Sequence, residues 1–457
     1  MKKNVNWKKA MIAVPLSVGL LLPSYHVANA HDHSGNHSDH MASVSTPASD
    51  IRASLDALFS EHAFLAVVAM QKGIDGADDF DQAAGALNAN TDDLAAAVTS
   101  VYGEEGGAAF KDIWSSHIGY FVDYVTATAE DNEEGRQAAL AELDEYTVEQ
   151  AAFLDTATES RLKASELEEG LKMHVEQLVW AFDNYVAGDF DKTYENLRHA
   201  IEHMYGPGKG LSWAITDQFP EKFENTSVDT PAADLRSDLN HLFSEHAALA
   251  ILAMQKGIDG AGDFDASAAA LGENTTDLSA AVASVYGEEG GTQFEEIWSS
   301  HIGYFVDYVV ATAEENEEGK EMALANLEEY KVEQAAFLET ATEGRLKAEV
   351  LEAGLQMHID ELLMAFNSYN EADYETAYET IRESYAHMFG VGEMLSGAIV
   401  DQHPDKFAQE KPSDMPNAGM GGAATNGINP AILWSIAGIF SALFALQVIA
   451  RRKASNL

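Results

Sequence analysis

The stretch LFSEHAFLAVVAMQKGIDGADDF (Leu58–Phe80) is repeated almost unchanged as LFSEHAALAILAMQKGIDGAGDF (Leu242–Phe264). A second stretch, IWSSHIGYFVDYV at Ile113, recurs at Ile297 with the same offset of 184 residues. The offset stays constant from residue 52 to residue 223 of the first copy, with no insertion or deletion. A unit this long, about 175 residues, is a whole domain with its own core rather than a solenoid repeat. The chain therefore contains one domain written twice.

Both copies have the residue pattern of helices. Apolar residues recur at intervals of three and four, as in Leu55, Leu58, Phe59, His62 and Leu65, which is typical of one buried helix face. Proline is absent from 52–206 and from 236–402, as long helices require. Asn90–Asp93 has the composition of a helix cap. We predict an all-α fold of two tandem antiparallel helical bundles, with six or seven helices each, and a C-terminal transmembrane helix.

The two ends of the chain read as export and anchoring signals. A basic start, an apolar stretch and Ala28-Asn29-Ala30 predict a signal peptide removed before His31. Ala431–Ala450 is twenty residues without a charge, enough to span a bilayer, and Arg451-Arg452-Lys453 places the C-terminus in the cytoplasm. Met415-Pro416-Asn417-Ala418-Gly419 resembles the Leu-Pro-x-Thr-Gly signal by which sortases attach Gram-positive proteins to the cell wall, with changes at the first and fourth positions.

The predicted organisation has eight segments. They are a signal peptide (1–30), a His-rich disordered segment (31–49), helical repeat 1 (50–223), a linker (224–233), helical repeat 2 (234–407), a disordered spacer (408–429), the transmembrane helix (430–450) and a basic tail (451–457). We expect the protein outside the cytoplasm, held at the membrane or, through sortase, at the cell wall of a Gram-positive bacterium.

Composition excludes several kinds of site. The chain has no cysteine, which rules out disulfides, cysteine-ligated zinc, iron–sulfur clusters and covalently attached haem. Its formal net charge is −48, with 75 acidic and 27 basic residues. Such a surface repels phosphates, so we expect no nucleic-acid partner, and it attracts cations. A saline or alkaline habitat also explains an acidic surface.

The start of the mature chain, HDHSGNHSDHM, is rich in metal-binding side chains. A free amine at His31 followed by Asp32 and His33 offers four nitrogens in a plane, which favours Cu(II) or Ni(II). His37, His40 and Met41 add further ligands. The alternative is a flexible polar tail that histidine happens to enrich.

Four further histidines in each copy fall among large apolar residues of four predicted helices. A buried imidazole is costly unless its nitrogens are bonded, and a metal shared inside a bundle meets that requirement. Neighbouring methionines would add soft ligands suited to copper. The alternative is that each ring donates to a backbone carbonyl or a core carboxylate. The candidate ligands are His62, His117, His174 and His203 with Met173 and Met204, and His246, His301, His358 and His387 with Met357 and Met388.

The motifs LFSEHAALAILAMQKGIDGA, ASVYGEEGG and IWSSHIGYFVDY resemble a family of exported, duplicated helical proteins of Bacillus-like bacteria, sometimes named copper amine oxidase. The resemblance covers residues 52–407 and implies copper as the ligand. Copper amine oxidases build a quinone from the tyrosine of Asn-Tyr-Asp/Glu. The nearest match, Asn184-Tyr185-Val186, lacks the acid and becomes Ser368-Tyr369-Asn370 in the second copy.

These observations lead to one main functional prediction and two alternatives. We expect a surface-anchored metal-binding protein, with copper as the favoured ion and another transition metal as the substitute. The first alternative is a metal-dependent oxidoreductase, which needs an open coordination position. The second is a non-catalytic surface spacer or adhesin, in which the core histidines would bind nothing.

Overall fold

The computed structural model describes residues 42–407 and is all-helical, with no strand in that range. The first half contains α1 (Pro47–Asp75), α2 (Phe80–Ala129), α3 (Glu133–Ala157), α4 (Ala164–Ala187), α5 (Phe190–His203) and α6 (Tyr205–Gln218). The second half contains α7 (Pro231–Asp259), α8 (Phe264–Ala313), α9 (Glu317–Ala341), α10 (Ala348–Asn370) and α11 (Tyr374–Gln402). The 3₁₀ turns η2 (Pro220–Phe223) and η3 (Pro404–Lys406) follow α6 and α11. The predicted signal peptide, transmembrane helix and basic tail, and the histidines up to Met41, lie outside the described residues.

Each half begins with a proline-led, threonine-capped helix, a few residues before the predicted boundary. The side chain of Thr46 accepts a hydrogen bond from the backbone N–H of Ser49, and that of Thr230 accepts one from Ala233. Pro47 and Pro231 occupy the first helical position, where a missing N–H costs nothing. Residues 47–49 therefore belong to the first helix and not to the N-terminal segment predicted to be disordered.

The number of helices differs between the halves, and one residue pair explains why. The first half has six α-helices, as predicted, but the second has five, because α11 is continuous where α5 and α6 are separated at Met204. Pro207 stands beside this break, and its ring cannot sit inside a continuous helix without a kink. The second half has Val391 at the equivalent position, so the helix continues.

The sequence predicted that a helix starts near Asn90, but none starts there. The helix continues through this region and is kinked further along the chain. Helix α2 runs through this region and bends at Gly103 (φ 78°, ψ 173°), and α8 bends at Gly287 (φ 82°, ψ 168°). Only glycine adopts such angles readily. Asn90 is not a cap: it lies inside α2 and is fully buried. The prediction mistook a residue with a tertiary role for a local signal.

The kink makes Gly107 a point of close approach, and this gives a test of the fold. A Cβ at Gly107 would lie 2.9 Å from the carbonyl oxygen of Ala95, so Gly107→Ala is expected to lower the free energy of unfolding by about 1–3 kcal/mol. Gly119 of the same helix has nothing within 4 Å, and Gly119→Ala should stabilise by about 0.5–1 kcal/mol. Urea denaturation of both variants measures the contrast. Equal effects at the two glycines would show that the kink is wrongly placed.

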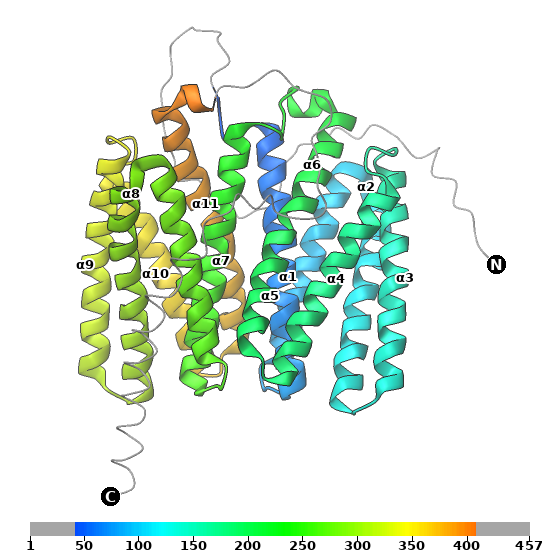
Figure 1. Ribbon diagram of the computed structural model, residues 1–457, viewed down its shortest axis with the longest axis horizontal. Coiled ribbons are helices and arrows are strands. Elements are labelled where there is room, and N and C mark those ends of the chain that lie inside the picture. The colour runs from blue at the N-terminus through cyan, green and yellow to red at the C-terminus, as the bar shows by residue number, and fades with distance from the viewer. Residues whose placement is uncertain (1–41, 408–457) are drawn as a thin grey trace, which may run out of the picture.

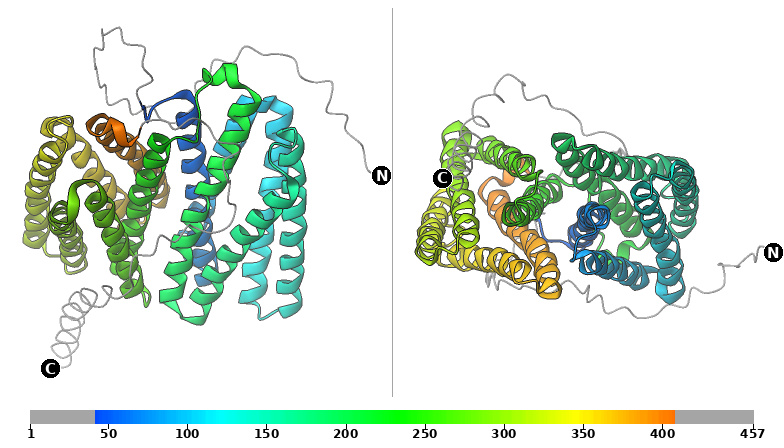
Figure 2. Two further views of the ribbon diagram at one scale, coloured as in Figure 1. Left: turned by 45° about the horizontal axis from the view of Figure 1, so that its top comes forward. Right: turned by 90° about the horizontal axis from the view of Figure 1, so that it is seen from below.

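The two halves stand side by side with their helices roughly parallel or antiparallel, the first half to the right in Figure 1. Figure 2 shows that α1 and α7 lie toward the middle, each covered by the helices around it. Most residues of both helices are buried, and one apolar core cluster contains residues of both halves. Reciprocal ion pairs cross between the halves, Arg52 to Asp234 and Arg236 to Asp50, each at 2.6 Å.

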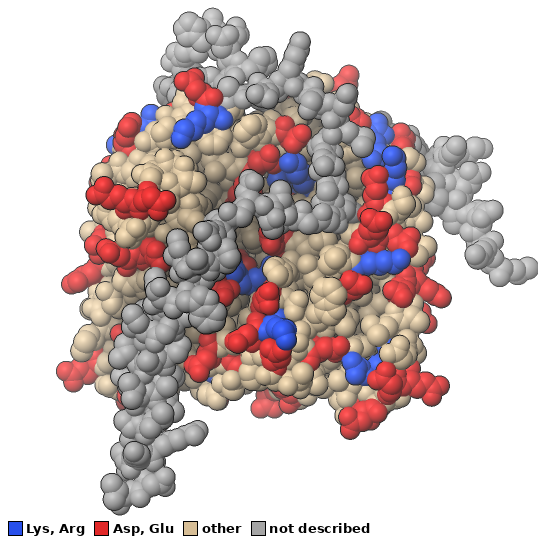
Figure 3. All heavy atoms as spheres, in the orientation of Figure 1, with Lys and Arg blue, Asp and Glu red and all other residues tan. Residues whose placement is uncertain are grey.

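Among the charged side chains on the face of the molecule shown in Figure 3, acidic ones are more frequent than basic ones, as the charge of −48 predicts. Within residues 42–407, α1 is the one helix long and apolar enough to cross a membrane, but 94% of its apolar window is buried in the protein. That composition therefore reflects its place in the core.

Candidate metal centre

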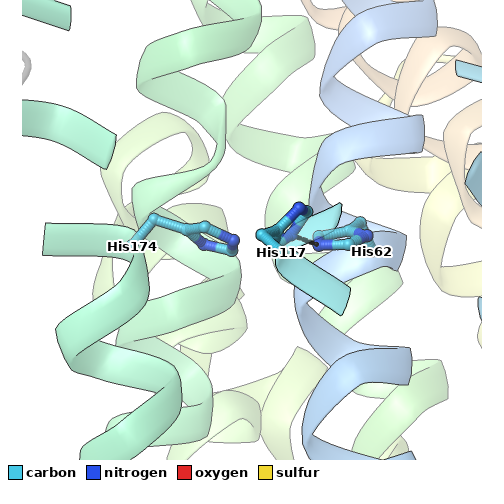
Figure 4. Close-up of side chains that lie close together, drawn as sticks. All are labelled: His62, His117 and His174. Atoms are coloured by element: carbon cyan, nitrogen blue, oxygen red, sulfur yellow. Dashed lines mark hydrogen bonds between the residues drawn. The ribbon is translucent and has the colours of Figure 1, made fainter. Parts of the chain in front are cut away.

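Three of the histidines predicted in the first half meet inside it. His62 comes from α1, His117 from α2 and His174 from α4, and Figure 4 shows their rings pointing toward one another. Each side chain is almost wholly shielded from solvent, with exposures of 0%, 0% and 1%. One nitrogen of each ring lies within 4.8 Å of the others. The cluster depends on three helices, so no local sequence motif contains it.

The spacing of the nitrogens fits a single small cation. Nε2 of His117 lies 3.2 Å from Nε2 of His62. Two nitrogens at this separation, each about 2.0 Å from one ion, subtend about 106° at the ion, close to a tetrahedral angle. Only a modest movement of the third ring would complete a three-nitrogen set. The geometry thus matches histidine ligation without rebuilding of the helices.

The second half repeats this arrangement. His246 of α7, His301 of α8 and His358 of α10 have exposures of 0%, 0% and 3%, and one nitrogen of each lies within 4.8 Å of the others. The two Nε2 atoms of His246 and His301 are 3.3 Å apart. The same geometry in two copies that differ at surface positions indicates that the clusters are a property of the shared core.

The rings are neutral at ordinary pH. Burial lowers the pKa of His117 and of His301 to about 3, although the carbonyls of Trp114 and Trp298 act in the opposite direction. Burial, reinforced by the two neighbouring rings, holds the pKa of His62 well below 6.5, and the same holds for His246. A neutral imidazole keeps the lone pair that a metal needs.

The third histidine of each cluster has two unused nitrogens. Within the described residues, neither Nδ1 nor Nε2 of His174 has a hydrogen-bond partner, and the same is true of His358. An unpaired buried nitrogen costs about 1–3 kcal/mol, and each of these two equivalent rings has two such nitrogens. A metal bond to one nitrogen of each ring would offset part of it. These unpaired atoms mark the clusters as candidate metal sites.

Aromatic side chains fix the orientation of the rings. His117 stacks on Tyr146 with ring centres 4.4 Å apart, and His62 lies 4.8 Å from the ring of Trp114. In the second half His301 stacks on Tyr330 at 4.6 Å. Of the aromatic residues of IWSSHIGYFVDYV in the first half, Trp114, Phe121 and Tyr124 are buried, and Tyr120 is half-buried. The contacts of the histidines with their aromatic neighbours restrict the rings to few orientations, which favours a preorganised site.

His203 and His387 do not join the clusters. Nε2 of His203 lies 3.0 Å from the carbonyl oxygen of Gly170, one turn before His174, and Nδ1 of His387 lies 3.4 Å from Glu361. The predicted groups of four are therefore groups of three, because a backbone oxygen and a carboxylate already engage the fourth ring. Of the methionines suggested as soft ligands, Met204 lines a small cavity beside His174, and Met357 is 38% exposed.

Two residues of the centre had no recognisable sequence signal. Glu61 precedes His62 and is 6% exposed, and its carboxylate accepts a hydrogen bond of 2.7 Å from Nδ2 of Asn90. The amide oxygen of Asn90 and Nδ1 of His62 are both buried and have no hydrogen-bond partner among the described residues. Asn274 repeats the hydrogen bond to Glu245, which precedes His246, at 2.8 Å. The only available signal was that Ser-Glu-His and the asparagine are unchanged between the copies.

An apolar cavity of about 150 Å³ adjoins the second cluster. His246 and His301 form part of its wall, and the rest is largely apolar, including Met254, Phe264 and Phe305. It is large enough for a molecule of a few heavy atoms next to the histidine nitrogens.

Comparison of the chain with protein-family models, curated proteins and solved structures finds no match in any of the three. The function must therefore be argued from the site itself.

Proposed function

We propose that the protein is an extracytoplasmic, surface-anchored metal-binding protein that holds one metal ion in each half. The observation that supports this most is the pair of buried three-histidine clusters, each with a third ring whose two nitrogens have no hydrogen-bond partner in the described part of the chain. The proposal includes the two-bundle organisation, the C-terminal membrane helix and attachment to the cell wall through sortase.

Copper is the ion we propose. Each cluster offers three neutral imidazoles and includes no carboxylate, and all three rings are buried. A monovalent ion is less costly than a divalent one to bury beside neutral ligands, which favours Cu(I) over Zn²⁺. Imidazole also binds zinc, nickel and iron, so another transition metal is the substitute. The histidines at positions 31, 33, 37 and 40 and Met41 would collect Cu(II) at the start of the mature chain.

Calorimetry tests this proposal once the N-terminal ligands are removed. We define the tail-silenced chain as the full chain with His31, His33, His37 and His40 replaced by alanine. Titration with Cu(I) should show two ions per chain, and X-ray absorption should show nitrogen ligands at about 2.0 Å. Replacing His174 by leucine should reduce the stoichiometry to one. If the binding heat is no greater than that of a chain lacking all six clustered histidines, the proposal is refuted.

A metal-dependent oxidoreductase is the second candidate, and the cavity of about 150 Å³ beside His246 and His301 favours it. A small apolar molecule such as dioxygen fits that volume, and three protein ligands leave a coordination position open. The cavity is small for a bulky amine. Oxygen consumption by the copper-loaded protein with a range of amines should then appear. If no amine supports oxygen consumption, metal binding remains the proposed function.

A further inference from the structure

Each histidine cluster is connected to an arginine of the opposite half. Glu61 lies beside the ligand His62 on α1, and Arg382 of α11 binds both oxygens of its carboxylate, at 3.0 Å and 3.1 Å. Arg382 also donates to Asp93 at 2.7 Å. Because Glu61 is 6% exposed, this is a shielded, two-point ion pair and not a surface contact. A helix of the second half therefore holds the residue next to a ligand of the first.

Asn90 links Glu61 of α1 to helix α2, which carries the ligand His117. Its Nδ2 donates to Glu61 at 2.7 Å and to the carbonyl oxygen of Leu58 at 2.9 Å, which uses both hydrogens of the amide. Asn90 thus ties α2 to Glu61 and Leu58 of α1, the helix that carries His62. The ring nitrogens that these two helices bring together, Nε2 of His62 and Nε2 of His117, lie 3.2 Å apart.

The second half has the reciprocal connection. Arg198 of α5 binds both oxygens of Glu245 at 3.1 Å, and Asn274 donates to Glu245 at 2.8 Å and to the carbonyl of Leu242 at 2.9 Å. Each arginine thus belongs to one half and acts on the cluster of the other.

We propose that Arg382 and Arg198 are positioning residues that act across the halves: each fixes a glutamate–asparagine contact that joins the two helices carrying His62 and His117, or His246 and His301. This inference rests on the proposed metal function. It adds that neither site is complete within its own half, so that docking of the two halves preorganises both sites. A purely structural role would instead make the two arginines equivalent, each weakening both sites through loss of docking.

Crossed affinity measurements test this. In the tail-silenced chain, His358→Leu leaves only the first site and His174→Leu leaves only the second. Arg382→Gln should weaken Cu(I) binding at the first site about 10- to 100-fold, the range expected for loss of an outer-shell partner, and leave the second unchanged. Arg198→Gln should do the reverse. Arg345→Gln is the matched control, because Arg345 pairs with Asp401 at 3.3 Å within the second half and touches neither network.

A conservative variant keeps the test informative if the glutamine variants do not fold. Arg382→Lys keeps the charge but cannot bind both carboxylate oxygens, and it should give a smaller loss, again only at the first site. Equal weakening of both sites by either arginine variant, or no weakening with folding intact, would overturn the inference. Absence of binding in the parent chain would instead refute the proposed function, so the two failures are distinguishable.

Discussion

The metal-free protein is expected to unfold in mild acid, between about pH 6.5 and pH 5. The six clustered rings have pKa values far below 6.5 when folded and about 6.5 when unfolded, so the unfolded chain binds more protons in this range. Stability is therefore full above pH 6.5 and falls as the pH drops. At pH 5.5 each ring favours unfolding by about 1.4 kcal/mol, or up to about 8 kcal/mol for six, comparable to the whole stability of a typical domain.

Circular dichroism at 222 nm against pH measures this transition. The double variant His174→Leu with His358→Leu removes two of the six rings, and its midpoint should lie at lower pH with a shallower dependence. Leucine also removes nitrogens that have no partner in the described part of the chain, so the variant should be no less stable at neutral pH. Identical acid transitions in the two proteins would contradict the pKa assignment.

Copper should stabilise the parent protein strongly. An ion present at about 100 times its dissociation constant adds about 2.7 kcal/mol per site, so two sites add about 5 kcal/mol and raise the Tm by on the order of 10 °C. The same ion should also move the acid transition to lower pH. The metal binds the histidine nitrogens of the folded protein, whereas protons reach these nitrogens only when the site opens. Differential scanning calorimetry with and without Cu(I) measures the shift.

The leucine double variant is again the control for this effect. It retains four of the six clustered histidines and the acidic surface, but each site has lost one ligand. Its Tm should therefore change little on addition of copper. A shift as large as that of the parent protein would mean that the metal binds elsewhere, for example among surface carboxylates.

The sequence predicted the helices well because their signal is local and duplicated. Apolar periodicity and the long proline-free stretches predicted an all-helical fold, which the structure confirms for residues 42–407. The break near Met204 occurs in only one copy. Predicting it would have required comparing Pro207 with Val391, the residue at the equivalent position of the second copy. The kinks at Gly103 and Gly287 fall in the stretch VYGEEGG of each copy, but their positive φ depends on the packing of the two helix segments.

The candidate site could be predicted only in part, because convergence is a tertiary property. Helical spacing placed His62, His117 and His174 on buried faces, and duplication made an accidental placement less credible. Nothing in the sequence distinguished them from His203, whose Nε2 lies against a backbone oxygen one turn from His174. The links from Arg382 to Glu61 span 321 residues, beyond the reach of any local pattern.

The most direct test is the metal content of the tail-silenced chain purified from its own host. We predict about two copper ions per chain, falling to one when either His174 or His358 is replaced by leucine and to none when both are. A chain that carries no transition metal, or whose metal content is indifferent to these two histidines, would contradict the account.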